Sequence, residues 1–156
     1  MAIIGNIIKG VIQLGNSISS ETNHTQNQQD TLHYLLQKAK DTEFGKHYKF
    51  GEIIRNKNPF VEFKNSIPYF DYDKLHNEWW YKLHDGEENI TWPGKPEYFA
   101  LSSGTTGKTS KRIPVTEDMV DSIRNAGIKQ ILAMKNFDLP ADFFEKEIMM
   151  LGSSTN

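Results

Sequence analysis

The chain has 156 residues, which is enough for one domain with a sizeable hydrophobic core or for part of a larger domain. Its formal net charge of −2 provides no global electric field that would favour nucleic acid or an acidic membrane as a partner. The absence of cysteine excludes disulfides, thiolate metal sites and cysteine nucleophiles. This composition is typical of a cytoplasmic protein whose chemistry uses other groups.

The start of the chain, MAIIGNIIKGVIQLGNSISS, predicts an amphipathic helix. It lacks the basic leader and the cleavage site of an export signal, and it is too short and too interrupted to span a bilayer. The apolar residues with helical spacing are Ile3, Ile4, Ile7, Ile8, Val11 and Ile12. We expect this face to pack on a protein body, because membrane-surface helices, the alternative, usually carry more basic residues than the single Lys9.

The polar, nearly uncharged residues 15–29 predict a loop or a capped helix start. We therefore expect residues 1–29 to form an N-terminal helix with a polar connector, ahead of a second part that covers residues 30–156. A helix with the apolar stripe Leu32, Leu35, Leu36 and Ala39 should follow, ending near Thr42 to Gly45, where Gly45 can adopt positive φ.

Short helices or extended pieces, broken by two prolines, are expected next. Asp71 or Asp73 is a candidate N-cap of a helix that buries Leu75, Trp79 and Leu83. The pattern then changes to a strand at 98–101, a loop and a second strand at 112–115.

Thr116 is placed to cap the final helix, which should end near Asn136. Its predicted buried face consists of Val120, Ile123, Gly127, Ile131 and Met134. The uninterrupted apolar run 148–151 predicts a strand covered on both faces, for which the sequence offers few neighbours. We therefore predict an α/β fold in which N-terminal helices precede a strand–loop–strand and a helix–strand unit, and we expect the remainder of the same polypeptide to follow Asn156.

The loop between the two strands lies in the run FALSSGTTGKTSKRIPVT, residues 99–116. Its Gly107-Lys108-Thr109 portion matches the second half of a Walker A loop, but Ser102 occupies the position of the first required glycine. A Walker loop also continues into a helix, and Pro114 in the second turn of that helix would cost about 3 kcal/mol. The sequence therefore favours a strand–loop–strand.

The chemistry of this loop suits a polyphosphate better than a neutral ligand. Its hydroxyl donors are Ser102, Ser103, Thr105, Thr106, Thr109 and Ser110. Gly104 and Gly107 allow backbone N–H groups to approach a ligand, and Lys108, Lys111 and Arg112 add positive charge with no acid among them. The alternative from composition alone is a solvated hairpin tip that binds nothing.

The sequence SSGTTGKTSK followed by RIPVT resembles the phosphate-binding motif of the acyl-adenylate-forming, firefly-luciferase-like superfamily. Lys111 comes one residue later than in the usual form and Ser110 replaces a proline, a spacing that resembles the auxin-responsive Gretchen Hagen family of acyl-acid amido synthetases. The upstream stretches that support this resemblance are DTEFGKHYKFGEI, SIPYFDYDKL and HDGEENITWPG.

The resemblance implies an ATP-dependent ligase that adenylates a carboxylate with Mg²⁺ present and conjugates it to an amine or amino acid. It also implies that residues 30–156 are the incomplete N-terminal part of an adenylate-forming domain. The residues implied to wrap the ATP phosphates are Ser102, Ser103, Gly104, Thr105 and Thr106. Gly107 would permit the turn, and Lys111 would act catalytically at the β- and γ-phosphates. The resemblance assigns no role to Lys108 or Arg112. It places the adenine contacts and the metal-binding acid beyond Asn156, so the piece alone is expected to be inactive.

Two other functions remain open at this stage: an acyl-CoA ligase, whose acceptor would be chosen by residues elsewhere, and a non-catalytic ATP-binding or interaction module. Trp79, Trp80 and Tyr81 could line an acyl pocket, although an aromatic stripe on a helix is more typical of a core. The five histidines lack the spacing of a metal site. We expect no nucleic-acid partner and no membrane span.

Overall fold

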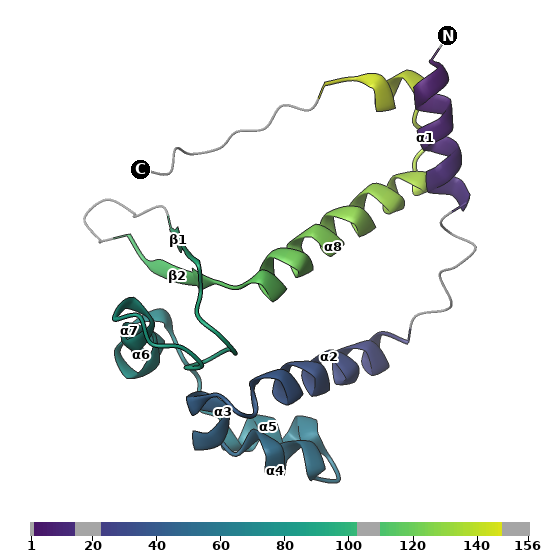
Figure 1. Cartoon of the computed structure of the whole chain (residues 1–156). Coiled ribbons are helices and arrows are strands. Elements are labelled where there is room, and N and C mark those ends of the chain that lie inside the picture. The colour runs from purple at the N-terminus through teal and green to yellow at the C-terminus, as the bar shows by residue number, and fades with distance from the viewer. Residues whose placement is uncertain (1, 15–22, 103–109, 148–156) are drawn as a thin grey trace. The chain divides into compact units, whose positions relative to one another are not determined.

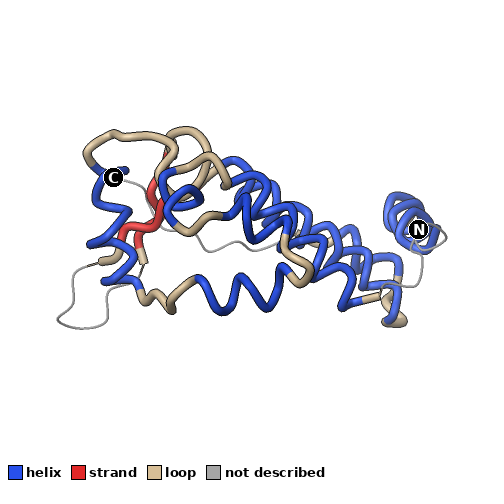
Figure 2. The backbone as a smooth tube through the Cα atoms, turned by 90° about the horizontal axis from the view of Figure 1, so that it is seen from below, coloured by secondary structure: helices blue, strands red, loops and turns tan. Residues whose placement is uncertain are grey.

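The computed structural model describes residues 2–14, 23–102 and 110–147. Contacts divide the molecule into two compact units, one comprising Met1–Thr22 with Ser122–Asn156 and the other Asn23–Asp121. The described residues are mostly helical, with one two-stranded antiparallel sheet (Figures 1 and 2). The predicted boundary at residue 29 stays a prediction.

Helix α2, His24–Ala39, begins the larger unit. Asn23 caps it, since its side-chain oxygen accepts a hydrogen bond from the backbone N–H of Gln26 at 3.2 Å. Leu36 and Ala39 of the predicted stripe are buried, whereas Leu35 remains 43% exposed. The capped helix start and the helix itself were thus predicted, and only part of the stripe enters the core.

Gly45 does not end that helix by adopting positive φ, so this prediction was wrong. Gly45 lies inside the next helix, α3, Glu43–His47, and its φ is not positive. A Cβ at Gly45 would lie 2.0 Å from the carbonyl oxygen of Ala39. Glycine is required there because the backbone of α3 passes directly against the end of α2.

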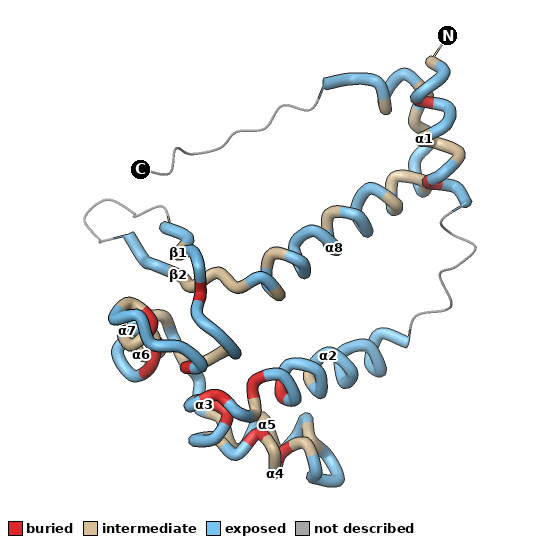
Figure 3. Tube along the Cα trace, viewed as in Figure 1, coloured by how far each residue is buried: buried red, intermediate tan, exposed pale blue. Residues whose placement is uncertain are grey.

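The helices that follow are α4 Phe50–Arg55, α5 Pro59–Ser66, α6 Tyr72–Leu75 and α7 Tyr81–His84, with a π-helical turn at His76–Trp80 before α7. One core cluster joins Leu36, Ala39, Phe50 and Ile53, and a second joins Trp79, Leu83 and Ile90. Figure 3 shows the buried residues gathered around α3 and its neighbours. Phe44 packs against both clusters, so α3 links them.

Of the two predicted candidates, Asp71 caps α6, because its Oδ1 accepts the backbone N–H of Lys74 at 2.8 Å, while Asp73 lies inside the helix. Trp79 and Leu83 are buried, and Leu75 packs against their cluster while only partly buried. The cap fixes the direction of the aromatic helical segment that lies beside the sheet.

The sheet consists of β1, Tyr98–Leu101, and β2, Arg112–Val115, with Leu101 paired to Arg112 and Tyr98 to Val115. Both strands have the bounds expected from the sequence. Thr116 then accepts a hydrogen bond on Oγ1 from the backbone N–H of Met119 at 3.2 Å, as expected of a cap.

Helix α8, Glu117–Ala133, continues into a 3₁₀ turn at Met134–Asn136, close to the predicted end. Its predicted buried face is wrong for the described structure. No residue of α8 is buried, and Ile123 and Ile131 are 61% and 52% exposed. No described element packs closely along that face.

In the other unit, helix α1, Ile3–Leu14, packs against a 3₁₀ turn at Ala141–Glu145. The backbone N–H of Gly5 donates to Oε1 of Glu145 at 2.8 Å, and Nζ of Lys9 donates to the carbonyl of Leu139 at 2.7 Å. Gly5 and Ile12 are buried. The side of α1 that packs therefore contains Gly5, which allows the turn at Ala141–Glu145 to approach the helix closely.

The predicted apolar face of α1 packs only in part: Ile12 is buried and Ile8 is half-buried. The residues that stay more than half exposed are Ile3, Ile4, Ile7 and Val11. A Cβ at Gly5 would lie 1.9 Å from the carbonyl oxygen of Ala141, so the close approach of this turn to α1 requires a glycine. The strand predicted at 148–151 lies outside the described residues.

Candidate functional site

The hairpin β1–β2 carries the predicted phosphate loop at its end. Two hydrogen bonds join Ser102 and Lys111 beyond the strands: the Ser102 N–H donates to the Lys111 carbonyl at 3.0 Å, and the Lys111 N–H donates to Oγ of Ser102 at 3.1 Å. The structure thus brings together the first and last residues of the predicted site. The other predicted residues, Ser103, Gly104, Thr105, Thr106 and Gly107, lie outside the described residues.

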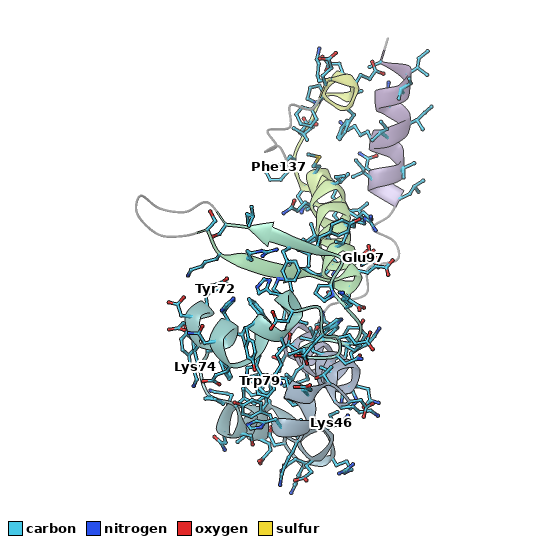
Figure 4. The ribbon with its side chains drawn as sticks, turned by 60° about the vertical axis from the view of Figure 1, so that its left-hand side comes forward. Lys46, Tyr72, Lys74, Trp79, Glu97 and Phe137 are labelled. Atoms are coloured by element: carbon cyan, nitrogen blue, oxygen red, sulfur yellow. The ribbon has the colours of Figure 1, made fainter. Side chains whose placement is uncertain are left out.

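Tyr72 of α6 contacts the base of this loop. The backbone N–H of Arg112 donates to the Tyr72 hydroxyl at 2.9 Å, and Nζ of Lys111 lies 4.9 Å from the centre of the Tyr72 ring. Figure 4 shows Tyr72 on the helical segment beside the two strands. Sequence reasoning missed this residue because nothing in its local pattern indicates a contact with a strand some forty positions away.

A row of rings continues from Tyr72 under the hairpin. Tyr72 stacks on His76 with ring centres 5.6 Å apart, His76 lies 5.3 Å from His84, and His84 lies 4.6 Å from Phe99 of β1. The guanidinium carbon of Arg112 lies 5.2 Å from the centre of the Phe99 ring. Aromatic and imidazole rings therefore support both strands close to the loop.

His84 is held in its neutral form within this row. Burial lowers the pKa of His84, and Coulombic interactions with Arg112 and His76 act in the same direction, while Asp85 opposes them. Neither ring nitrogen of His84 has a hydrogen-bond partner among the described residues. A neutral imidazole keeps additional positive charge away from Arg112.

Asp118, at the start of α8, holds the segment after β2 in place. Its carboxylate accepts hydrogen bonds from Nε1 of Trp92 at 3.0 Å and from the hydroxyl of Tyr34 at 2.9 Å, with Nζ of Lys38 at 3.4 Å. These hydrogen bonds, with Trp92 contributing most, lower the pKa of Asp118. The start of α8 is thereby joined to α2 and to the segment before β1.

A cavity of about 190 Å³ lies beside the hairpin. Its lining includes Trp80, Leu83, Thr91, Trp92, Pro114 and Thr116. Trp80 lines this cavity and donates to the Thr91 hydroxyl at 3.1 Å, whereas Trp79 belongs to the core. This volume is below the range usual for small-molecule pockets, so we interpret the cavity as a packing gap and not as a ligand site.

Within the described ranges, no three histidine, aspartate or glutamate side chains come together as a metal site. Nor does any helix there combine the length and apolar character needed to cross a bilayer. The loop base therefore remains the principal candidate site.

Comparison with protein-family models matches residues 15–156 to the GH3 family N-terminal domain. The chain belongs to the GH3 family. This is the auxin-responsive Gretchen Hagen family of acyl-adenylate-forming amido synthetases, the family indicated by the sequence motif. No curated protein and no solved structure gives a match.

Membership of the GH3 family supports, at the level of the family, a conjugating ligase that acts on small molecules through an acyl-adenylate. The match begins at residue 15 and contains the entire hairpin, whereas helix α1 precedes it. The loop base thus lies in the part of the sequence that defines membership.

Proposed function

We propose that this chain provides the ATP phosphate-binding part of an ATP-dependent amido synthetase. A substrate carboxylate attacks the α-phosphorus of ATP, pyrophosphate leaves, and an amine, such as that of an amino acid, then displaces AMP from the acyl-adenylate. The observation that supports this proposal is the closed hairpin base, where Ser102 and Lys111 bracket the SSGTTGKTSK run in a member of the GH3 family.

The Ser102 hydroxyl accepts the Lys111 N–H and still has its own proton to donate, which suits it to a phosphate oxygen. Lys111 is exposed and takes part in none of the ion pairs found among the described residues. Its ammonium group can therefore turn to a polyanion without giving up a carboxylate. A donor hydroxyl and an uncompensated cation fit the charge of a triphosphate.

We assign the remaining phosphate contacts by the family motif. Their residues are Ser103, Gly104, Thr105 and Thr106, with Gly107 permitting the turn. In this role Lys111 stabilises negative charge that develops on the departing pyrophosphate, and the loop holds the triphosphate in line with the carboxylate. We expect the adenine and acceptor contacts to come from sequence beyond Asn156, within a larger α/β domain.

Mg²⁺ would neutralise phosphate charge when it is bound with ATP. The described residues bring no set of carboxylates together to hold it, so we assign no protein ligand to the metal. The roles assigned to Ser102 and Lys111 depend on hydrogen bonding and charge alone.

Carboxylate-dependent ATP–pyrophosphate exchange by the complete natural protein tests this function. Lys111→Ala should lower the exchange rate about 10²- to 10³-fold, by analogy with the loss of one oxyanion donor. Lys74→Ala is the matched control, because Lys74 also lies over an aromatic ring, that of Phe70, at 4.8 Å but away from the loop. Unchanged exchange in Lys111→Ala would contradict the assigned role.

A further inference from the structure

Tyr72 makes two different contacts with consecutive residues of the hairpin. Its hydroxyl accepts the backbone N–H of Arg112 at 2.9 Å and lies 3.4 Å from the carbonyl oxygen of Arg112. Its ring lies under Nζ of Lys111 at 4.9 Å. One side chain from α6 therefore contacts both the backbone of β2 and the cation that follows the loop.

The contact with Arg112 fits the geometry of the ladder. The Ser102 N–H bonds to the Lys111 carbonyl, so the next pair, Leu101 and Arg112, occupies a non-hydrogen-bonded position in the antiparallel alternation. The N–H and C=O of Arg112 consequently point away from β1. Tyr72 supplies a partner on this open edge and holds β2 in place immediately after Lys111.

The contact of the Tyr72 ring with Lys111 differs from an ion pair because it leaves the ammonium group free to bind an anionic ligand. An aromatic face attracts the ammonium group but leaves its full charge and its three N–H donors. A carboxylate at the same place would neutralise the charge and would compete with a phosphate. The ring therefore limits the positions of a long, exposed side chain while leaving it able to bind an anion.

We propose that Tyr72 is a positioning residue for Lys111, and that the Tyr72 ring holds the lysine ammonium beside the base of the hairpin before ATP binds. This role rests on the proposed function, because it acts through the phosphate contact assigned to Lys111. Tyr72 itself touches no reacting atom. The hydroxyl stabilises the hairpin, and the ring orients the cation.

Kinetics on the complete natural protein separate these two contributions. Tyr72→Leu removes both ring and hydroxyl, and should lower kcat/KM for Mg·ATP in carboxylate-dependent pyrophosphate exchange about two- to fivefold, the size of an exposed cation–π contact. Tyr72→Phe keeps the ring and should stay close to the wild-type value. Equal losses in the two variants would overturn the proposal, because the hydroxyl would then account for the effect.

A double-mutant cycle shows whether Tyr72 acts through Lys111. In the Lys111→Ala background, Tyr72→Leu should cause no further loss of residual exchange, since the partner of the ring is already absent. Losses that multiply would indicate a general structural role and would overturn the proposal. If Lys111→Ala alone leaves exchange unchanged, the proposed function fails and the positioning role fails with it.

A measurement that does not depend on turnover tests the contact between ring and ammonium directly. After reductive ¹³C-methylation, the Lys111 signal, assigned by its loss in Lys111→Arg, should be shifted by the ring of Tyr72. The shift should persist in Tyr72→Phe, disappear in Tyr72→Leu and change on addition of Mg·ATP. A Lys111 chemical shift identical in wild type and Tyr72→Leu would refute the contact between ring and ammonium. A Lys111 chemical shift that does not change on addition of Mg·ATP would contradict the phosphate role of Lys111.

Discussion

Replacing Thr42 by valine should loosen the start of α3 at a buried hydrogen-bonding site. Thr42 is 2% exposed, and its hydroxyl accepts the Gly45 N–H at 3.0 Å while donating to the Ala39 carbonyl at 2.7 Å. Valine preserves the shape but cannot accept the Gly45 N–H. The Ala39 carbonyl keeps a second donor, the backbone N–H of Thr42 at 3.1 Å, so Gly45 bears most of the loss.

The loss of a cap costs about 0.5–2 kcal/mol, and a buried donor left unpaired costs about 1–3 kcal/mol. When amide exchange is governed by the local opening equilibrium, a destabilisation of about 1–3 kcal/mol increases the exchange rate about 5- to 150-fold. Hydrogen exchange of the peptide covering α3, measured by mass spectrometry on the complete protein, reports this local effect without assuming two-state unfolding.

Two variants serve as controls for Thr42→Val. Thr42→Ser keeps the hydroxyl and should exchange much more slowly than the valine variant. Thr31→Val removes an exposed hydroxyl that donates to the Asn27 carbonyl at 2.7 Å, and it should leave the exchange of α3 unchanged. If Thr42→Val exchanges within about twofold of wild type, the capping argument is wrong.

Two other pairs of measurements follow from the same structure. Gly45→Ala should lower the melting temperature because its Cβ would meet the Ala39 carbonyl, whereas Gly127→Ala, with open space around its Cβ, should leave it unchanged or raise it; equal effects would contradict the close approach. Because the folded-state pKa of His84 is lowered, its neutral form stabilises the fold fully above the unfolded value of about 6.5, and stability should decline as pH falls below that value towards the folded pKa. His84→Phe should flatten this part of the pH dependence of the melting temperature, and an unaltered profile would argue against a buried neutral imidazole.

The hairpin and the caps could be predicted because the interactions that decide them are local. The β-branched and aromatic runs indicated β1 and β2 with their observed bounds, and Asp71 and Thr116 each satisfy an N–H three residues later. The phosphate motif also indicated the GH3 family, since a loop motif is a contiguous pattern. Its roles for Lys111 and the preceding residues stay predictions.

The direction in which α1 packs could not be read from its own residues. Its hydrophobic face was visible in the sequence, but the contact made by Gly5 depends on a turn at Ala141 that arrives from far along the sequence. Gly45 shows the same limitation, because glycine is typical both of helix ends and of close backbone approach. Only the position of the Ala39 carbonyl distinguishes the two.

Sequence alone determined the helices with clear caps, the two strands and the family, because each is encoded in neighbouring residues. Tertiary structure alone decided that Tyr72 lies against Lys111 and Arg112, and that the rings of His76 and His84 connect Tyr72 with Phe99 of β1. The contacts of Tyr72 with Lys111 and Arg112 join residues about forty positions apart, and packing of the capped aromatic helices against the hairpin brings them together. No short-range periodicity carries that information.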